Sequence, residues 1–112
     1  MKIIKSPTEE HIYQVWLDNG ELFDGLEGTD YENGIDEPIL NFQICTSYSC
    51  TSLKDLKKEA VDHAQFMNGL MLFIDALEKY PETENVKVYT DTDDGDSFIH
   101  IDIPFNHPII QI

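Results

Sequence analysis

Carboxylates are the residues of this sequence whose number and spacing suggest chemistry. The stretch 18–37 contains no Lys or Arg, and its acidic residues are Asp18, Glu21, Asp24, Glu27, Asp30, Glu32, Asp36 and Glu37. A second group, also without a Lys or Arg, comprises Asp91, Asp93, Asp94, Asp96 and Asp102. Negative charges at this density repel one another, and a cationic partner relieves the repulsion. The pattern therefore favours a surface that binds a basic protein.

One aromatic residue lies within the first acidic group with no core-like periodicity around it. This residue is Tyr31, and we expect its side chain to be exposed. Aromatic side chains surrounded by charge are typical of the residues that dominate binding at protein interfaces. Trp16 and Phe23 lie in a predicted hairpin and are expected in the core. The predicted partner-binding residues are Asp18, Glu21, Asp24, Glu27, Asp30, Tyr31, Glu32 and Asp36.

Other groups of residues in the sequence do not indicate a metal site or a catalytic site. The run that begins at Asp91 is similar to a calcium loop, but its glycine comes one position too early and strands are expected on both sides. Cys45 and Cys50 need two histidines to make a zinc site, and nothing in the spacing brings them together. The chain also has no phosphate-binding glycine loop, no Gly-x-Ser-x-Gly turn and no His-Glu-x-x-His motif. We therefore expect no catalytic residue, no metal, no cofactor and no enzyme activity.

The charge balance excludes several classes of partner. The chain has 112 residues, of which 22 are Asp or Glu and 7 are Lys, with no Arg, so its net charge is −15. Nucleic acids and anionic membranes bind to clustered cations, which this sequence lacks. No apolar run approaches the roughly 18 residues of a membrane span. The start of the sequence has no secretion signal, so we expect a cytoplasmic protein with reduced thiols.

The elements that must position these residues are easiest to predict in the second half of the chain. Ser52 followed by Asp55 is typical of a helix start. The apolar residues that follow at helical spacing are Leu53, Leu56, Ala60, Ala64, Met67, Leu70, Ile74 and Leu77, and Pro81 ends the pattern. This predicts one long helix, or two pieces broken near His63–Gly69, where Asn68-Gly69 weakens the middle.

A hairpin follows the helix. Residues 86–90 and 98–103 alternate between apolar and polar around Asp94-Gly95, a two-residue turn signal. Pairing about this turn places Val88 opposite Ile101 and Val86 opposite Ile103 on the apolar face. On the other face it places Tyr89 opposite His100 and Lys87 opposite Asp102, an attractive pair.

The N-terminal half predicts strands with less regular patterns. Residues 11–17 and 21–23 form a hairpin around Asn19-Gly20, residues 24–38 form a long acidic loop, and residues 38–45 form a further strand. The apolar tail 108–112 is a candidate edge strand. We predict one α+β domain over residues 1–112, with an antiparallel sheet of four to five strands and one long helix packed on one face, in the order β-β-β-α-β-β.

The functional hypothesis follows from the charge and from the missing motifs. We expect a small acidic inhibitor that binds and occludes a cationic protein, specifically an immunity protein that neutralises a nuclease-type bacterial toxin. One alternative is a phage protein that mimics DNA and blocks a host defence nuclease, which requires phosphate-like spacing of carboxylates along one extended face. Another is a non-catalytic adaptor or oligomer subunit whose acidity serves solubility.

Overall fold

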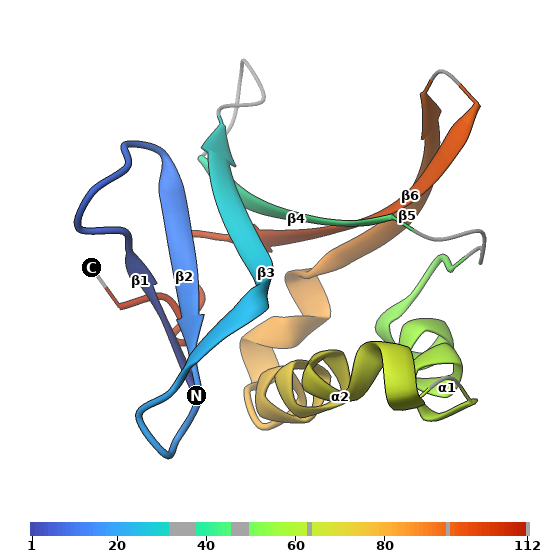
Figure 1. Ribbon diagram of the computed structural model, residues 1–112, viewed down its shortest axis with the longest axis horizontal. Helices are drawn as coiled ribbons and strands as arrows, with labels where there is room; N and C mark the ends of the chain where they lie inside the picture. Colours follow the sequence, from blue (N-terminus) through green and yellow to red (C-terminus); the bar gives the residue numbers. More distant parts are fainter. Residues whose placement is uncertain (32–37, 46–49, 63, 94, 112) are drawn as a thin grey trace.

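The computed structural model describes residues 1–31, 38–45, 50–62, 64–93 and 95–111. Six strands form one antiparallel sheet in the order β1-β2-β3-β4-β6-β5. Both α-helices lie against the same face of the sheet, and a short 3-10 helix, η1, leads into β5 (Figure 1). The bounds are β1 Lys2–Lys5, β2 Ile12–Trp16, β3 Leu22–Tyr31, β4 Ile39–Cys45, α1 Leu53–Asp62, α2 Ala64–Glu78, η1 Pro81–Asn85, β5 Lys87–Asp93 and β6 Asp96–Pro104.

The predicted α+β class and antiparallel sheet are confirmed, whereas the predicted strand count of four to five is too low. The missed strand is β1, in which only Ile3 is fully buried. A strand with one core residue leaves no alternating pattern to detect. Its partners come from distant parts of the chain: β2 on one side, and a parallel bridge from Ile3 to Ile110 in the C-terminal tail on the other.

The helical segment is two helices, so the prediction of one long helix is wrong and the two-piece alternative is correct. The ammonium of Lys57 in α1 lies 3.0 Å from carboxylate oxygens of Asp75 and Glu78 in α2. In a continuous helix, residues 57 and 75 would lie about 27 Å apart at 1.5 Å per residue. The helices therefore fold back beside each other, with Leu56, Leu70, Phe73, Ile74 and Leu77 buried.

The predicted helix start and the predicted hairpin register are confirmed. The Ser52 hydroxyl accepts a hydrogen bond from the Asp55 amide at 3.1 Å, as an N-cap does. In the hairpin, Val88 pairs with Ile101, and the pairs on the other face are Tyr89 with His100 and Lys87 with Asp102. Val86 lies before β5, at the end of η1, so its predicted pairing with Ile103 is not part of the ladder.

The predicted acidic loop at residues 24–38 is wrong for its first eight residues, which belong to β3. Residues 32–37 lie outside the described part of the chain. Between Gln14 and Val15 of β2 the register shifts, so that residues 24–26 of β3 are extra. Beyond this bulge β3 also pairs with β4, from Gly28 with Phe42 to Tyr31 with Ile39. Two-sided pairing keeps this polar segment extended although its composition favours a loop.

Gly28 allows β3 to approach β4 and the core. A Cβ added to Gly28 would lie 2.8 Å from Cδ1 of Leu40 and 2.9 Å from Cζ of Phe42, both fully buried side chains. We expect Gly28→Ala to lower the free energy of unfolding by about 1–3 kcal/mol through overpacking. Thr29→Ala, at the exposed next position, should change it by about 0.5 kcal/mol or less. Urea unfolding of both variants tests this, and equal midpoint shifts would contradict it.

The C-terminal tail is fixed by a buried histidine, His107. Its Nε2 lies 2.8 Å from the Thr83 hydroxyl, which donates to the Leu77 carbonyl. Because that hydroxyl has only one proton, Nε2 must be the donor to Thr83. Nδ1 accepts a hydrogen bond from the Ile109 amide at 3.1 Å. A proton added to Nδ1 would point at this N–H group, so the hydrogen bond would be lost. Burial lowers the pKa of His107, and the charge of Glu82 opposes this shift.

We therefore expect His107 to make stability depend on pH. Its pKa is lower in the folded chain than in the unfolded one, so its contribution is present above about pH 6.5 and is lost as the pH falls below that value. His107→Gln cannot be protonated, so its free energy of unfolding should fall less between about pH 7.5 and 5.5 than that of the unchanged chain. Urea titrations at each pH measure this difference. Parallel pH profiles for the two proteins would contradict the assignment.

Candidate functional site

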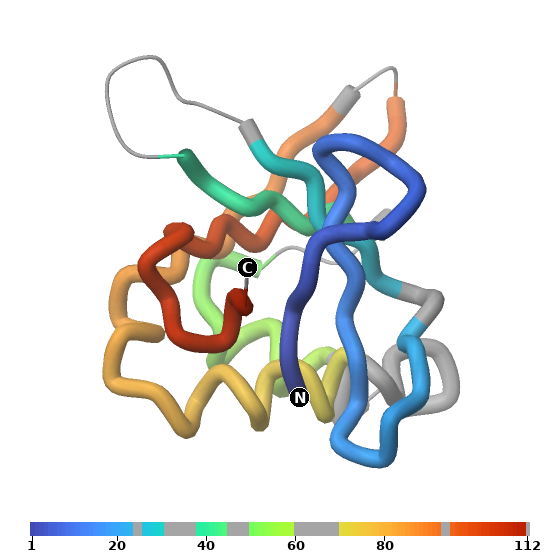
Figure 2. Tube along the Cα trace, turned by 90° about the vertical axis from the view of Figure 1, so that its left-hand side faces the viewer, coloured from blue at the N-terminus to red at the C-terminus, as the bar shows by residue number. Residues whose placement is uncertain are grey.

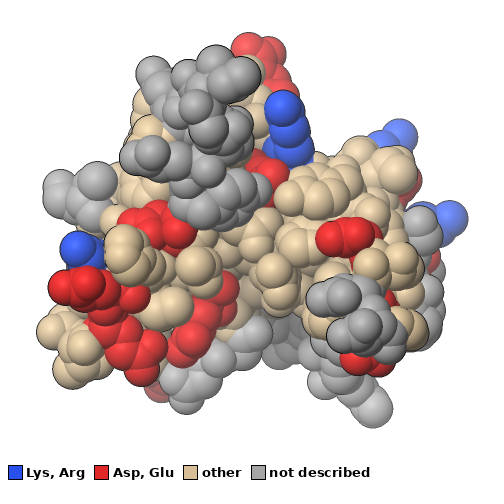
Figure 3. Space-filling view, turned by 90° about the horizontal axis from the view of Figure 1, so that it is seen from above, with Lys and Arg blue, Asp and Glu red and all other residues tan. Residues whose placement is uncertain are grey.

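The face of the sheet opposite the helices is the candidate site. The central strands bend so that this outer face is concave (Figure 1), and no described helix covers it. Figure 3 looks onto this face and shows uncharged side chains across its middle, with Asp and Glu side chains gathered most densely toward the N-terminal strands. The register aligns polar residues of the outer face in two rows, Thr29–Asn41–Asp102–Lys87 and Gln43–His100–Tyr89.

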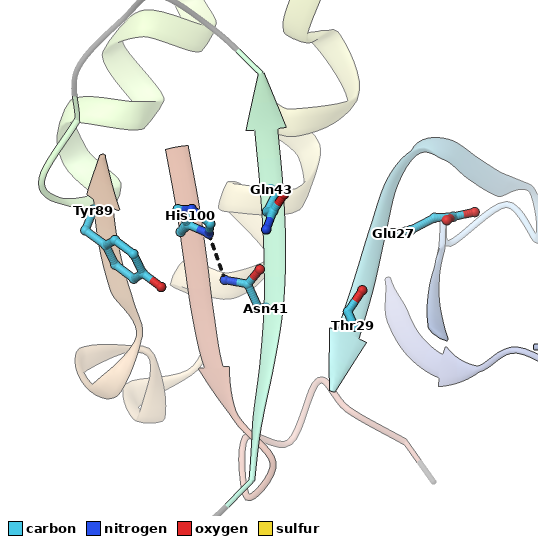
Figure 4. Close-up of a pocket in the computed structure, with 6 residues that line it drawn as sticks. All are labelled: Glu27, Thr29, Asn41, Gln43, Tyr89 and His100. Carbon is cyan, nitrogen blue, oxygen red and sulfur yellow. Dashed lines mark hydrogen bonds between the residues drawn. The ribbon is translucent and has the colours of Figure 1, made fainter. Parts of the chain in front are cut away.

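A buried polar network lies at the centre of this face. The Asn41 side-chain nitrogen donates to Oδ1 of Asp102 at 2.6 Å and lies 3.2 Å from Nδ1 of His100 (Figure 4). Asn41, His100 and Asp102 are 6%, 9% and 7% exposed, although they face away from the apolar core. Polar groups at this depth are stabilised by hydrogen bonds to one another, and breaking one leaves the other unsatisfied.

The network continues to β5 through two contacts of His100. The Tyr89 ring stacks on the imidazole, with ring centroids 4.8 Å apart and an interplanar angle of 12°. Nε2 of His100 lies 3.7 Å from Oδ2 of Asp91, whose side chain is 62% exposed. Asp91 thus brings a solvent-facing negative charge to the edge of the network.

A hollow forms where β3 separates from β4. The β3–β4 ladder ends at Gly28 and Phe42, while β3 continues along β2. The space beside this fork has a volume of about 430 Å³ and is lined by Glu27, Thr29, Asn41, Gln43, Tyr89 and His100. In Figure 4, Thr29 lies on β3 across the gap from Asn41, and the Glu27 carboxylate points away from the other labelled side chains. The hollow is therefore open, polar and built on rigid strands.

The predicted partner-binding residues whose side chains the structure describes, Asp18, Glu21, Glu27 and Asp30, lie in different places. Glu27 lines the hollow, but Asp18 and Glu21 are exposed at the β2–β3 turn, at the opposite end of β3 from Asp30 and Tyr31. Asp18 accepts a hydrogen bond from the amine of Met1, which lowers the pKa of the carboxyl. The side chains of Asp24 and Tyr31 fall outside what the structure describes, as do residues Glu32 and Asp36 entirely.

Asp30 faces the other side of the sheet from Glu27. It lies two positions after Gly28, whose Cβ direction points into the core, and strand side chains alternate between faces. Its carboxylate lies 2.7 Å from Nδ1 of His11, an exposed residue whose φ is +66°. Burial raises the pKa of Tyr13, and the charge of Asp30 raises it further. Asp30 is thus engaged in contacts within the chain.

The candidate-site residues that the acidic pattern missed are Asn41, Gln43, Tyr89, His100 and Asp102. A signal for them is present in the sequence: Asn41 and Gln43 alternate with Leu40, Phe42 and Ile44, and His100 and Asp102 alternate with Ile99, Ile101 and Ile103. Polar residues alternating with core residues on two strands mark a second, polar face. The sequence pattern does not show that β4 pairs with β6, and this pairing brings the polar residues of the two strands together.

The remaining candidates for chemistry have ordinary surroundings. Cys50 is buried and unpaired, and burial raises the pKa of its thiol. Its backbone exchanges hydrogen bonds with the Thr90 hydroxyl at 3.0 and 3.1 Å. Within the described ranges, the His, Cys, Asp and Glu side chains form no group of three or more that could hold a metal ion.

No family model, curated protein or solved structure matches the chain. Among the described residues, no helix is both long enough and apolar enough to cross a membrane.

Proposed function

We propose that this chain is a small acidic inhibitor that binds a cationic protein and occludes it. In this proposal the partner is a nuclease-type bacterial toxin, and the chain is its cognate immunity protein. One observation carries the proposal: a chain of net charge −15 has a concave polar sheet face with one carboxylate in the lining of its hollow, Glu27 on β3, and another beside His100, Asp91 on β5.

The proposed mechanism is steric occlusion guided by charge. A nuclease active site binds phosphates with basic residues, and carboxylates on the inhibitor take the place of those phosphates. Opposite fields on the two proteins raise the association rate constant toward about 10⁸–10⁹ M⁻¹s⁻¹ at low salt. The concave face then excludes the substrate, so the chain needs no catalytic residue of its own.

The placement of the described acidic residues favours this proposal over DNA mimicry. A mimic needs carboxylates in a regular row on one face, but Glu27 and Asp30 lie on opposite faces of β3. Asp30 is also engaged with His11. If the acidity served only to keep the chain in solution, the outer face would not need a buried polar network.

An inhibition assay tests the proposal. The chain is immobilised, basic proteins are captured from native cells at low salt and eluted at high salt, and the captured protein is identified and purified. We expect a basic protein with nuclease activity that equimolar chain abolishes. A captured protein whose activity is unchanged by an excess of the chain would overturn the proposal, as would binding only to neutral or acidic proteins.

A further inference from the structure

Hydrogen-bond directions determine which groups the hollow at the β3–β4 fork offers to a ligand. The Asn41 side-chain nitrogen donates to Oδ1 of Asp102, 2.6 Å away. The second hydrogen of this nitrogen is directed at Nδ1 of His100, 3.2 Å away. Both donors of Asn41 are therefore used within the network. Its oxygen remains, and Figure 4 shows this oxygen turned away from His100, toward β3.

The same argument applies to His100. Nδ1 accepts from the Asn41 nitrogen, and Nε2 lies 3.7 Å from Oδ2 of Asp91. Nε2 of His100 thus faces Asp91, which is not among the residues that line the hollow. Asn41 and His100, the two most buried lining residues, leave acceptor atoms and a ring face for a ligand and no donor.

The other lining groups add one negative charge and three groups that can accept or donate hydrogen bonds. They are the Thr29 and Tyr89 hydroxyls, the Gln43 amide and the Glu27 carboxylate, and the lining contains no Lys or Arg. Lys87 shares the outer face opposite Asp102 but does not line the hollow. The one charged group of the lining is negative and the Asn41 oxygen is an acceptor, so the hollow favours a ligand that brings a positive charge and N–H donors.

We infer that the hollow receives an arginine side chain of the basic partner. This inference rests on the proposed function and deepens it. A guanidinium is planar, always charged and able to donate to several acceptors at once, and it stacks on aromatic rings such as those of Tyr89 and His100. Glu27 in the lining and Asp91, across His100, supply negative charge on the same face. An ammonium has a single donor centre and cannot reach acceptors spread across two strands in the same way.

An NMR titration with an arginine probe tests this inference. N-acetyl-arginine methylamide is added to the isotope-labelled chain, with the neutral citrulline analogue as the matched probe. We expect saturable amide shifts centred on residues 27–29, 41–43 and 89–100, with a dissociation constant on the order of millimolar. Citrulline, which has nearly the same shape, should bind at least about tenfold more weakly because it lacks the charge. Equal binding of both probes, or shifts confined to other parts of the chain, would overturn the inference.

A pair of variants separates local recognition from overall charge. Glu27→Gln removes the rim carboxylate, and Glu84→Gln removes one charge from the exposed surface of η1, outside the hollow. We expect Glu27→Gln to weaken arginine binding about twofold to fivefold and Glu84→Gln to leave it unchanged. Equal effects of both variants would show that only net charge matters and would overturn the inference.

The failure of this inference can be told apart from the failure of the proposed function. If the chain inhibits a basic partner but arginine leaves the hollow unshifted, the inference fails and the proposed function stands. If arginine binds in the hollow but no basic protein is inhibited, the proposed function fails and the site remains a guanidinium-binding site.

Discussion

Replacing Ile101 by Ala is expected to lower the free energy of unfolding by about 2–5 kcal/mol. Ile101 is fully buried and pairs with Phe42 of β4 on one side and Val88 of β5 on the other. Phe42 in turn packs on Phe73 of α2, with ring centroids 5.2 Å apart. Truncation therefore leaves a cavity between the sheet and the helices, where the neighbours cannot collapse freely. Urea unfolding followed by circular dichroism measures the loss.

The matched control is Lys87→Ala, in the same hairpin but on the outer face. Lys87 is exposed and lies opposite Asp102, so its loss should cost less than about 1 kcal/mol. Similar midpoint shifts for the two variants would mean that the faces of the hairpin are assigned wrongly.

The hairpin could be predicted because its information is local. Asp94-Gly95 lies between strands whose apolar and charged residues agree on one register, and Gly95 has the positive φ of +87° that such a turn needs. The start of α1 was predictable for the same reason, since Ser52 and Asp55 are three residues apart. Both features depend on neighbours in the sequence, so no knowledge of the rest of the fold is required.

The missed features depend on distant pairing. The end of β3 contains Gly25, Gly28 and several acids, and it is a strand because β2 and β4 flank it. The break between the helices follows from packing of both on one sheet, which the ion pair of Lys57 with Asp75 and Glu78 reflects. A helical pattern with plausible residues throughout does not show where such a packing-driven break falls.

The candidate site was only partly predictable. Of the predicted partner-binding residues, Glu27 lines the hollow, because its position on the outer face follows from strand alternation beyond the bulge. Asn41 reaches His100 and Asp102 across 59 and 61 residues of sequence, through the β4–β6 ladder. A count of charges finds acidic segments, but a polar network at the centre of a sheet requires the register.

Removing two carboxylates, one just before β3 and one within it, is expected to slow association with the basic partner about threefold to tenfold at low salt. The double variant is Glu21→Gln with Glu27→Gln, both exposed positions. Folding should be unchanged or slightly improved, because repulsion within the acidic chain falls. The dissociation rate should change less than the association rate, since charges at a rim act mainly during encounter.

The control removes the same charge from another part of the molecule. Glu78→Gln and Glu84→Gln lie on α2 and η1, away from the outer face, and Lys57 keeps its contact with Asp75. Surface plasmon resonance across a range of salt concentrations compares the two double variants. The β3 variant should also show a flatter salt dependence, because fewer charge pairs are screened. Equal slowing by both variants would assign the effect to net charge alone. If neither variant slows association, the acidity serves solubility and the inhibitor proposal fails.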